Sequence, residues 1–147
     1  MIGELDAGRI EEVLRRGTVA RIGCHADGRT YVVPVSYAYA GGCMWCHSAE
    51  GMKLRMMRAD PEVCVEVEEV DDLANWRSVI AWGRFEELTG AEAALGMELL
   101  VRRFMPDAAA AGQRPPAGGA PAGVTAFRIR LHERTGRYER RPEAARA

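Results

Sequence analysis

The residues best suited to chemistry lie between His47 and Lys53, in the stretch HSAEGMK. Ser48 offers a hydroxyl and Lys53 an ammonium, and the loop joins a predicted strand to a predicted helix. Because the first backbone N–H groups of a helix have no partner inside it, such a loop gathers hydrogen-bond donors and positive charge. This combination suits an anion such as phosphate, although many strand-to-helix junctions with the same appearance bind nothing.

The cysteines suggest a second chemistry. Cys43 and Cys46 form a C-x-x-C pair, and with His47, Cys24 and His25 they have the residue types of a zinc site or a redox dithiol. Residues i and i+3 of a strand, however, point to opposite faces, which separates the two thiols. We therefore expect no metal site, and we expect free cysteines that pack as small apolar side chains in a reducing compartment.

Two strands must position the loop. Thr30 to Ala40 is predicted to form one long strand, entered through an Asp27-Gly28 hairpin, and Gly41-Gly42 turns the chain into a strand at 43–48. Pro34 has no N–H to donate to a sheet, so the strand should be unpaired or bulged there. The freed backbone groups suit the edge of a planar ligand, but a plain sheet edge is the more common explanation.

Strands dominate the predicted secondary structure of the first ninety residues. Asp6 is expected to cap a helix over 7–16, and Thr89 with Glu92 predicts a capping box at the start of a helix that ends near Phe104. Gly83 predicts a bend or bulge. The remaining expected elements are strands at 18–25, 63–67, 76–88 and 124–133 and a helix at 52–59.

These elements predict a mainly β (α+β) protein, namely a closed or nearly closed antiparallel barrel of about six strands with short helices at its ends. A length of 147 residues suits a single domain over 1–147, with a flexible Pro/Gly/Ala-rich excursion at 107–123 and a frayed tail at 138–147. The net charge of −1 gives no reason to expect nucleic acid or a membrane as partner, and we expect a cytoplasmic protein.

Five segments in order resemble the flavin-binding split-barrel superfamily: YVVPVSYAY, CHSAEGMKL, ADPEVCVEV, NWRSVIAWGR and ERTGR. Within it, the chain is most similar to the pyridoxamine 5'-phosphate oxidase-related proteins of the nitroimidazole-resistance branch. The resemblance covers roughly residues 14–136, apart from the Pro/Gly/Ala-rich stretch. It implies a six-stranded antiparallel split β-barrel that forms a homodimer and holds flavin mononucleotide (FMN) at the subunit interface.

The resemblance also implies site residues. Val33, Pro34, Val35 and Ser36 would border the flavin ring, while His47, Ser48 and Lys53 would hold the ribityl phosphate, joined by Trp76, Arg77 and Ser78. His47 is the candidate catalytic residue, as a proton donor beside the ring, or else it orients the loop. Lys53 could equally be a surface lysine, Trp76 could be packing, and Arg77 could pair with Glu66 or Glu68 across the sheet.

The chain departs from vitamin B6 oxidases, so we do not expect B6 oxidation. No tryptophan follows Trp82, and Thr135-Gly136-Arg137 after the RLHER stretch suits the nitroimidazole-related branch better. The resemblance favours an FMN-dependent oxidoreductase acting on a small planar substrate. The alternatives are a non-catalytic flavin carrier or redox sensor, or a deazaflavin (F420) or haem user of the same fold.

Overall fold

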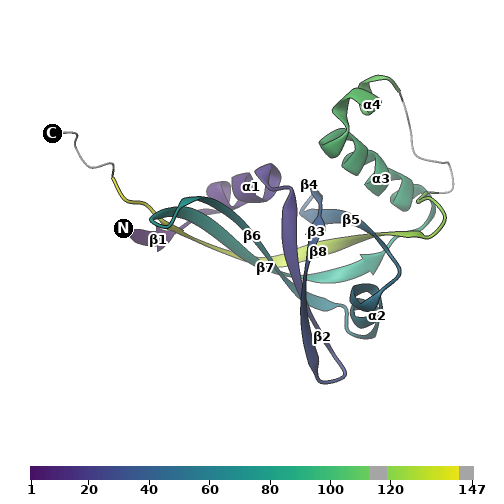
Figure 1. The fold of residues 1–147 in the computed structure, drawn as a ribbon, viewed down its shortest axis with the longest axis horizontal. Helices are drawn as coiled ribbons and strands as arrows, with labels where there is room; N and C mark the ends of the chain where they lie inside the picture. The colour runs from purple at the N-terminus through teal and green to yellow at the C-terminus, as the bar shows by residue number, and fades with distance from the viewer. Residues whose placement is uncertain (113–118, 143–147) are drawn as a thin grey trace.

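The computed structural model describes residues 1–112 and 119–142. Four helices flank one antiparallel sheet in this part of the chain (Figure 1). The helices are α1 (Ala7–Arg16), α2 (Met52–Ala59), α3 (Gly90–Phe104) and α4 (Pro106–Ala110). The strands are β1 (Ile2–Glu4), β2 (Val19–Ala26), β3 (Arg29–Ser36), β4 (Ala38–Ala40), β5 (Cys43–Ala49), β6 (Glu62–Asp72), β7 (Asn75–Glu87) and β8 (Val124–Glu139).

The sheet curls into a barrel that stays open on one side. Its strand order is β3-β2-β6-β7-β8-β5-β4, with β1 paired to β8. The first and last strands of this order, β3 and β4, are consecutive in the chain and are separated by Tyr37 alone. A single stretch of chain therefore joins the two ends of the sheet. This arrangement confirms the predicted mainly β split barrel, with the predicted strand at 30–40 divided into β3 and β4.

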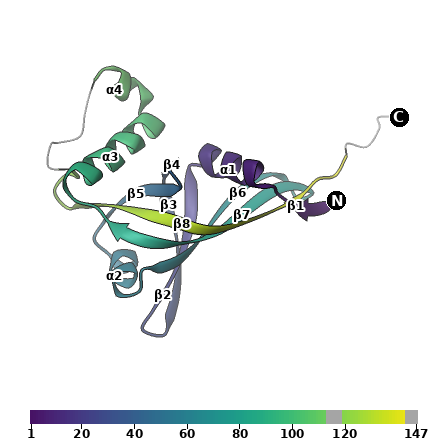
Figure 2. The ribbon, with the colours of Figure 1, turned by 180° about the vertical axis from the view of Figure 1, so that it is seen from behind.

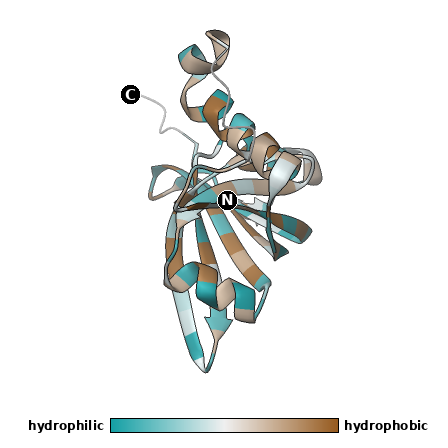
Figure 3. Ribbon diagram, turned by 90° about the vertical axis from the view of Figure 1, so that its right-hand side faces the viewer, coloured by the Kyte–Doolittle hydropathy of each residue, from teal (hydrophilic) through white to brown (hydrophobic). Residues whose placement is uncertain are grey.

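Alternation of side chains along the strands produces the core. Figure 3 shows hydrophobic and hydrophilic residues alternating along the strands. The inward-facing residues form a continuous buried cluster that includes Ile22, Tyr37, Met44, Val65 and Phe127. Helix α1 covers one end of this core, with Ile10, Val13 and Leu14 buried and its N-terminus capped by Asp6, whose Oδ1 accepts from the Arg9 N–H at 2.9 Å.

The prediction of six strands missed β1 and set two strands too short. β6 and β8 continue to Asp72 and Glu139. Beyond the barrel these residues form a long ribbon with the start of β7, where Glu68, Asp71 and Asp72 are exposed and the apolar alternation that marks a strand is lost. Gly136 also hid the continuation of β8, because glycine is uncommon inside strands. Glycine is nevertheless required at this position, because an added Cβ would lie 2.9 Å from Leu5 and Ile10.

Helix α3 packs on the outer side of β5 through a face one residue away from the predicted one. Ala93, Gly96 and Leu100 are buried, whereas the predicted contact residue Phe104 is exposed. A Cβ on Gly96 would lie 3.2 Å from the Trp45 ring, so this side of the helix can approach the ring closely. Thr89 occupies the N-cap position as predicted, but its side chain makes no capping hydrogen bond.

The Pro/Gly/Ala-rich excursion is described only in part. α4 forms at Pro106–Ala110, where no helix was predicted, while 113–118 of the excursion and 143–147 of the tail lie outside the described residues. In the part of the chain that is described, no helix combines the length and apolarity needed to cross a membrane.

Candidate functional site

The candidate site is the opening of the barrel, where β3 and β5 separate. β4 pairs with β5 in a register that joins Ala38 to Trp45 and Ala40 to Cys43. Continued past Tyr37, the same register would set Ser36 opposite His47 and Val35 opposite Ser48. Within the described residues this ladder is not formed, because β3 pairs only with β2 and this half of β5 pairs only with β8.

The opening brings the two predicted groups of site residues to face each other. Val33, Pro34, Val35 and Ser36 line one side, and His47 and Ser48 line the other. Unpaired backbone N–H and C=O groups need a partner, which at such an edge is water or a ligand. The edge at Pro34 is therefore as predicted: β3 is paired to β2 on one side and unpaired on the other in the described structure.

His47 and Ser48 point to opposite faces of β5. Ser48 lies on the core side and is buried, and its Oγ donates to the carbonyl of Ala49 at 2.7 Å. His47 is exposed on the outer side. Within the described residues its imidazole makes no hydrogen bond, so nothing there indicates that it orients the loop, and both ring nitrogens remain available to a ligand.

Lys53 follows in the first turn of α2 and is half-buried. It is the only lysine in the sequence, whose other basic residues are arginines. Burial raises the pKa of the Cys46 thiol, and the positive charge of Lys53 opposes part of that increase. The Lys53 ammonium therefore lies near Cys46, beside the end of β5. Lys53 forms no ion pair with any described residue, so its charge is free for an anion.

Trp76, Arg77 and Ser78 lie elsewhere in the same chain. Each is engaged with a carboxylate: Trp76 Nε1 donates to Glu139 at 3.0 Å, Arg77 to Glu69 at 3.2 Å and Ser78 Oγ to Glu66 at 3.0 Å. Arg77 therefore pairs across the sheet as its alternative interpretation proposed, but with the directly opposite Glu69 rather than with Glu66 or Glu68.

The strand register shows how far this group lies from the opening. His47 pairs with Ala126 and Trp76 pairs with Glu139, near opposite ends of the 16-residue strand β8. At about 3.3 Å per residue, the separation along the strand is roughly 40 Å. Figures 1 and 2 show the β6–β7 turn and α2 at opposite ends of the sheet. A single chain therefore does not bring Trp76, Arg77 and Ser78 to the barrel opening.

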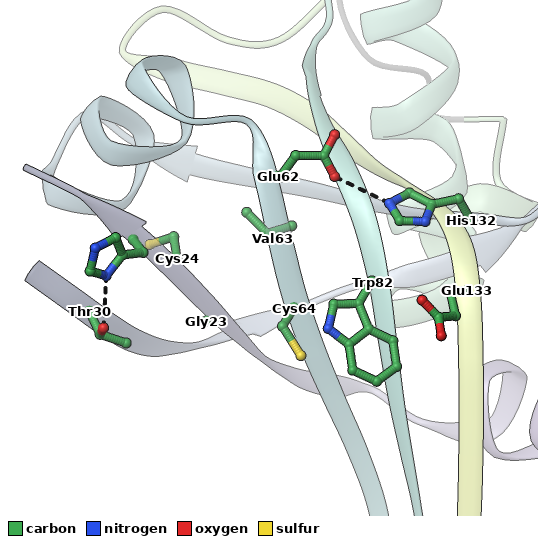
Figure 4. A pocket seen from close by; sticks show the side chains of 10 residues that line it. Gly23, Cys24, Thr30, Glu62, Val63, Cys64, Trp82, His132 and Glu133 are labelled. Carbon is green, nitrogen blue, oxygen red and sulfur yellow. Dashed lines mark hydrogen bonds and ion pairs between the residues drawn. The ribbon is translucent and has the colours of Figure 1, made fainter. Parts of the chain in front are cut away.

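A cavity of about 400 Å³ lies on the outer face of the sheet (Figure 4). Gly23, Cys64 and Trp82 occupy consecutive paired positions across β2, β6 and β7 and form its middle. At its rim, His132 Nε2 lies 3.2 Å from Glu62 Oε2, and His25 Nδ1 lies 2.9 Å from Thr30 Oγ1. The cavity presents a flat aromatic wall between polar groups that already have partners.

Sequence reasoning missed this cavity, although one signal pointed toward it. Gly83 was predicted to mark a bulge, and the β7–β8 register does shift there, between Trp82 opposite Glu133 and Gly83 opposite Leu131. The extra residue on β8 is His132. A Cβ on Gly83 would lie 2.5 Å from the Arg130 carbonyl, so only glycine permits the irregularity that brings His132 and Glu133 to the cavity.

The two cysteines of the C-x-x-C pair are separated as predicted. Cys46 belongs to the main core, whereas Cys43 belongs to the smaller cluster beneath α3, with Trp45 and Leu88. All four cysteines are free thiols.

The open barrel edge, with His47 and Lys53 on the strand and helix that follow it, defines a split-barrel protein. The pyridoxamine 5'-phosphate oxidase family model matches residues 6–138, and the chain therefore belongs to this family. An uncharacterised protein from Rhizobium meliloti (strain 1021) is 35% identical over 80 residues, which are 54% of this chain and 53% of that protein. That match spans about half the length of the relative.

Solved structures support the same assignment. A FAD-binding protein from Mesorhizobium loti is 31% identical, with a TM-score of 0.77 and coverage of 95% of this chain and 99% of that one. A proposed 5-nitroimidazole antibiotic resistance protein from Bacteroides thetaiotaomicron is 21% identical, with a TM-score of 0.77 and coverage of 94% and 87%. This second likeness is one of fold alone.

Proposed function

We propose that this chain is a flavin-binding protein that places the flavin ring along β3 and its ribityl phosphate at Lys53. The observation that carries the proposal is the barrel opening: β3 has an unpaired edge, and Lys53, in the first turn of the helix that follows β5, has no ion-pair partner among the described residues. Family membership and the FAD-binding relative from Mesorhizobium loti support it.

The residues present fit such a cofactor. The unpaired backbone of β3 offers donors and acceptors to the polar edge of a planar ring, and Val33 and Val35 offer apolar surface beside it. Lys53 and the first N–H groups of α2 suit a phosphate, which binds best where charge and free donors meet. Ser48 fits less well, because its hydroxyl already donates to a backbone carbonyl.

We further propose that the chain is an oxidoreductase acting on a small planar substrate. A bound flavin supplies the transfer of electrons and hydride, and the protein supplies placement, hydrogen bonds and exclusion of water. His47 can donate a proton beside the ring because its imidazole is exposed at the opening and has no partner among the described residues.

We propose that the functional unit is a homodimer. Trp76, Arg77 and Ser78 can join the flavin site only from a second copy, because roughly 40 Å of strand separates them from His47 within one chain. The outer face of the sheet also exposes apolar side chains, with Val32 at 61% and Ile80 at 40% of their full accessibility. A symmetric partner would cover this band.

β3 and Lys53 together offer contacts for a flavin ring and for one phosphate, and these are the groups of FMN. The sequence favours FMN over the dinucleotide because it has no Gly-rich fingerprint for a second phosphate. A deazaflavin or haem user of the same fold, and a flavin carrier or sensor without turnover, are the competing proposals.

The single lysine provides a direct test. An amine-directed reagent can label only Lys53 and the N-terminus, so mass spectrometry of the labelled protein reads both positions in one sample. Saturating FMN should protect Lys53 strongly while labelling of the N-terminus, the internal control, stays constant. Riboflavin, which lacks the phosphate, should protect less. Equal labelling of Lys53 with and without FMN, together with no quenching of FMN fluorescence on titration, would contradict the proposed site.

A further inference from the structure

The outer cavity contains a carboxylate without a partner. Glu62 at its rim is already engaged, with His132 at 3.2 Å and with Arg84 at 3.4 Å. Glu133 also lines the cavity, but its side chain forms no ion pair or hydrogen bond within the described residues. It lies directly opposite the half-buried Trp82 in the β7–β8 ladder. An aromatic ring beside an unpaired carboxylate favours arginine, because a guanidinium can lie over the ring and pair with the acid at the same time.

The same face of the sheet carries a matching cation. Arg137 follows Glu133 by four residues on β8, and both are exposed, as alternate positions on one side of a strand are. Their separation along the strand is about 13 Å. The Arg137 side chain forms no ion pair or hydrogen bond with any described residue, including Glu4, its neighbour across the β1–β8 ladder. This face therefore presents an unpaired acid and an unpaired base, with Thr135 midway between them.

A symmetric copy can satisfy both charges. In a two-fold interface the same patch of both copies meets, so that when one residue contacts a second, the second also contacts the first. An axis through the sheet at Thr135 would set Glu133 of each copy beside Arg137 of the other, because the two residues lie equally far from the axis on opposite sides. The exposed Ile80 pairs with Thr135 in the β7–β8 ladder, so an apolar side chain lies at the centre of this contact. Apolar centres with polar rims are typical of protein–protein interfaces.

We infer that the outer cavity receives the side chain of Arg137 from a second copy, where it pairs with Glu133 and lies against Trp82. The inference rests on the proposed homodimer, for which it gives the face, the position of the axis and the contact. Gly23 leaves part of the cavity without a side chain, and a volume of about 400 Å³ accommodates the arginine. Because the interface is symmetric, the contact occurs twice in each dimer.

Charge reversal at the two positions tests the contact in the whole chain. Arg137→Glu and Glu133→Arg should each raise the dissociation constant of the dimer about hundredfold or more, because like charges then meet at both symmetric contacts. An equimolar mixture of the two variants should form dimers again, since every reversed charge then faces an opposite one. Analytical ultracentrifugation over a series of concentrations measures the constants. Arg102→Glu, the same reversal at an exposed arginine of α3, is the matched control and should stay within about twofold of wild type.

The outcomes separate this inference from the proposed homodimer. If wild type is a monomer at every concentration, the homodimer and the inference fail together. If wild type and both variants are dimers, the interface lies on another face, and the homodimer stands without this contact. In that case, a change in tryptophan emission on adding a tetramethylammonium salt would assign the cavity to a small organic cation. If both variants dissociate and their mixture stays monomeric, Arg137 and Glu133 do not face each other and the inference is wrong.

Milder variants keep the test valid if a reversal disturbs the fold, which circular dichroism detects. Arg137→Gln and Glu133→Gln remove the charges without introducing repulsion, and each should still raise the dissociation constant about tenfold. Dissociation constants equal to that of wild type in both glutamine variants would overturn the inference.

Discussion

Individual side chains at the opening determine how a ligand would be held. The sequence indicated Lys53 and His47 as candidate site residues, because a hydroxyl, an ammonium and a helix start occur together in HSAEGMK. It did not predict which neighbours already have partners. Ser48, Arg77 and Ser78 are engaged with groups of the same chain, and only three-dimensional pairing reveals this.

Lys53→Ala should weaken flavin binding by about 1.5–3 kcal/mol, which corresponds to roughly ten- to more than hundredfold in affinity, because one charge-assisted contact to the phosphate is lost. The fold should be unaffected. Fluorescence-quenching titration measures the change, with Arg15→Ala on α1 as a control for the loss of one surface charge. An affinity within about twofold of wild type would make Lys53 a surface residue and displace the proposed phosphate position.

His47→Ala should retain the cofactor and slow electron transfer from the reduced flavoprotein to a nitroimidazole or quinone. The expected loss is roughly 10²-fold, the lower end of what a positioned acid contributes. Stopped-flow absorbance measures the rate, and added imidazole should restore part of it if the lost group acted on a proton. His25→Ala, which alters a histidine at the outer cavity, is the control. A variant as fast as wild type would favour the carrier or sensor function.

At the scale of elements, periodicity predicted the main strands of the barrel but not β1, and errors arose where tertiary pairing overrides local pattern. β8 extends to Glu139 because β1 and β7 pair with its charged end, which no alternation could signal. Helix α3 is rotated from its predicted face because Gly96 fits against Trp45. Pro34 predicted an unpaired edge on β3, but the separation of β3 from β5 could not be predicted, because it depends on strands that are distant in the sequence.

Arg128 anchors α3 to the sheet. Its guanidinium lies 5.2 Å from the Trp45 ring centroid, 3.1 Å from Glu86 and 2.9 Å from Glu92 of α3, with 14% of the side chain exposed. Arg128→Ala removes the cation–π contact with Trp45, the ion pair with Glu92 and one of the two ion pairs of Glu86, and should lower the free energy of unfolding by about 2–3 kcal/mol. Urea denaturation measures this. Arg102→Ala, which breaks only an exposed pair with Glu98, should cost less than about 0.5 kcal/mol.

Glu86 should make this contact sensitive to acid. A hydrogen bond from Arg130 is the largest of the effects that hold the pKa of the Glu86 carboxyl below its ordinary value; burial opposes it, and a weaker hydrogen bond from Arg128 adds to the lowering. A carboxyl with a lowered pKa stabilises the folded state above its unfolded pKa and loses that contribution as pH falls through its folded pKa. Wild type should therefore exceed Glu86→Gln in stability at pH 7, with the difference shrinking below about pH 4. If the difference in unfolding free energy between wild type and Glu86→Gln stays constant as the pH falls, the prediction is wrong.

At the scale of the whole molecule, the predicted site divides between two ends of one sheet. A family resemblance supplied both groups of residues, but their separation along β8 could not be predicted from the sequence, because it depends on the register of strands β5, β7 and β8. In the proposed homodimer, the second copy would bring Trp76, Arg77 and Ser78 to the opening of its partner.

Light scattering at micromolar concentration should give twice the monomer mass of 16.1 kDa. Ile80→Arg, on the exposed outer face, should shift the mass toward the monomer, because a charge without a partner opposes burial of that face. Leu95→Arg, at an exposed position of α3, is the control and should leave the mass unchanged. A monomer with flavin fully bound would refute the shared site.

The position of β8 also affects how the protein is made. Among the strands of the sheet β8 is the last to be synthesised, yet in the finished sheet it lies between β7 and β5 and pairs with β1 as well. While the ribosome is still translating the segment before Val124, β5 and β7 each lack a neighbour, and the apolar inner face of the sheet cannot close. A nascent chain stalled before β8 should thus recruit chaperones, whereas release of the last strand completes the barrel in a single late step.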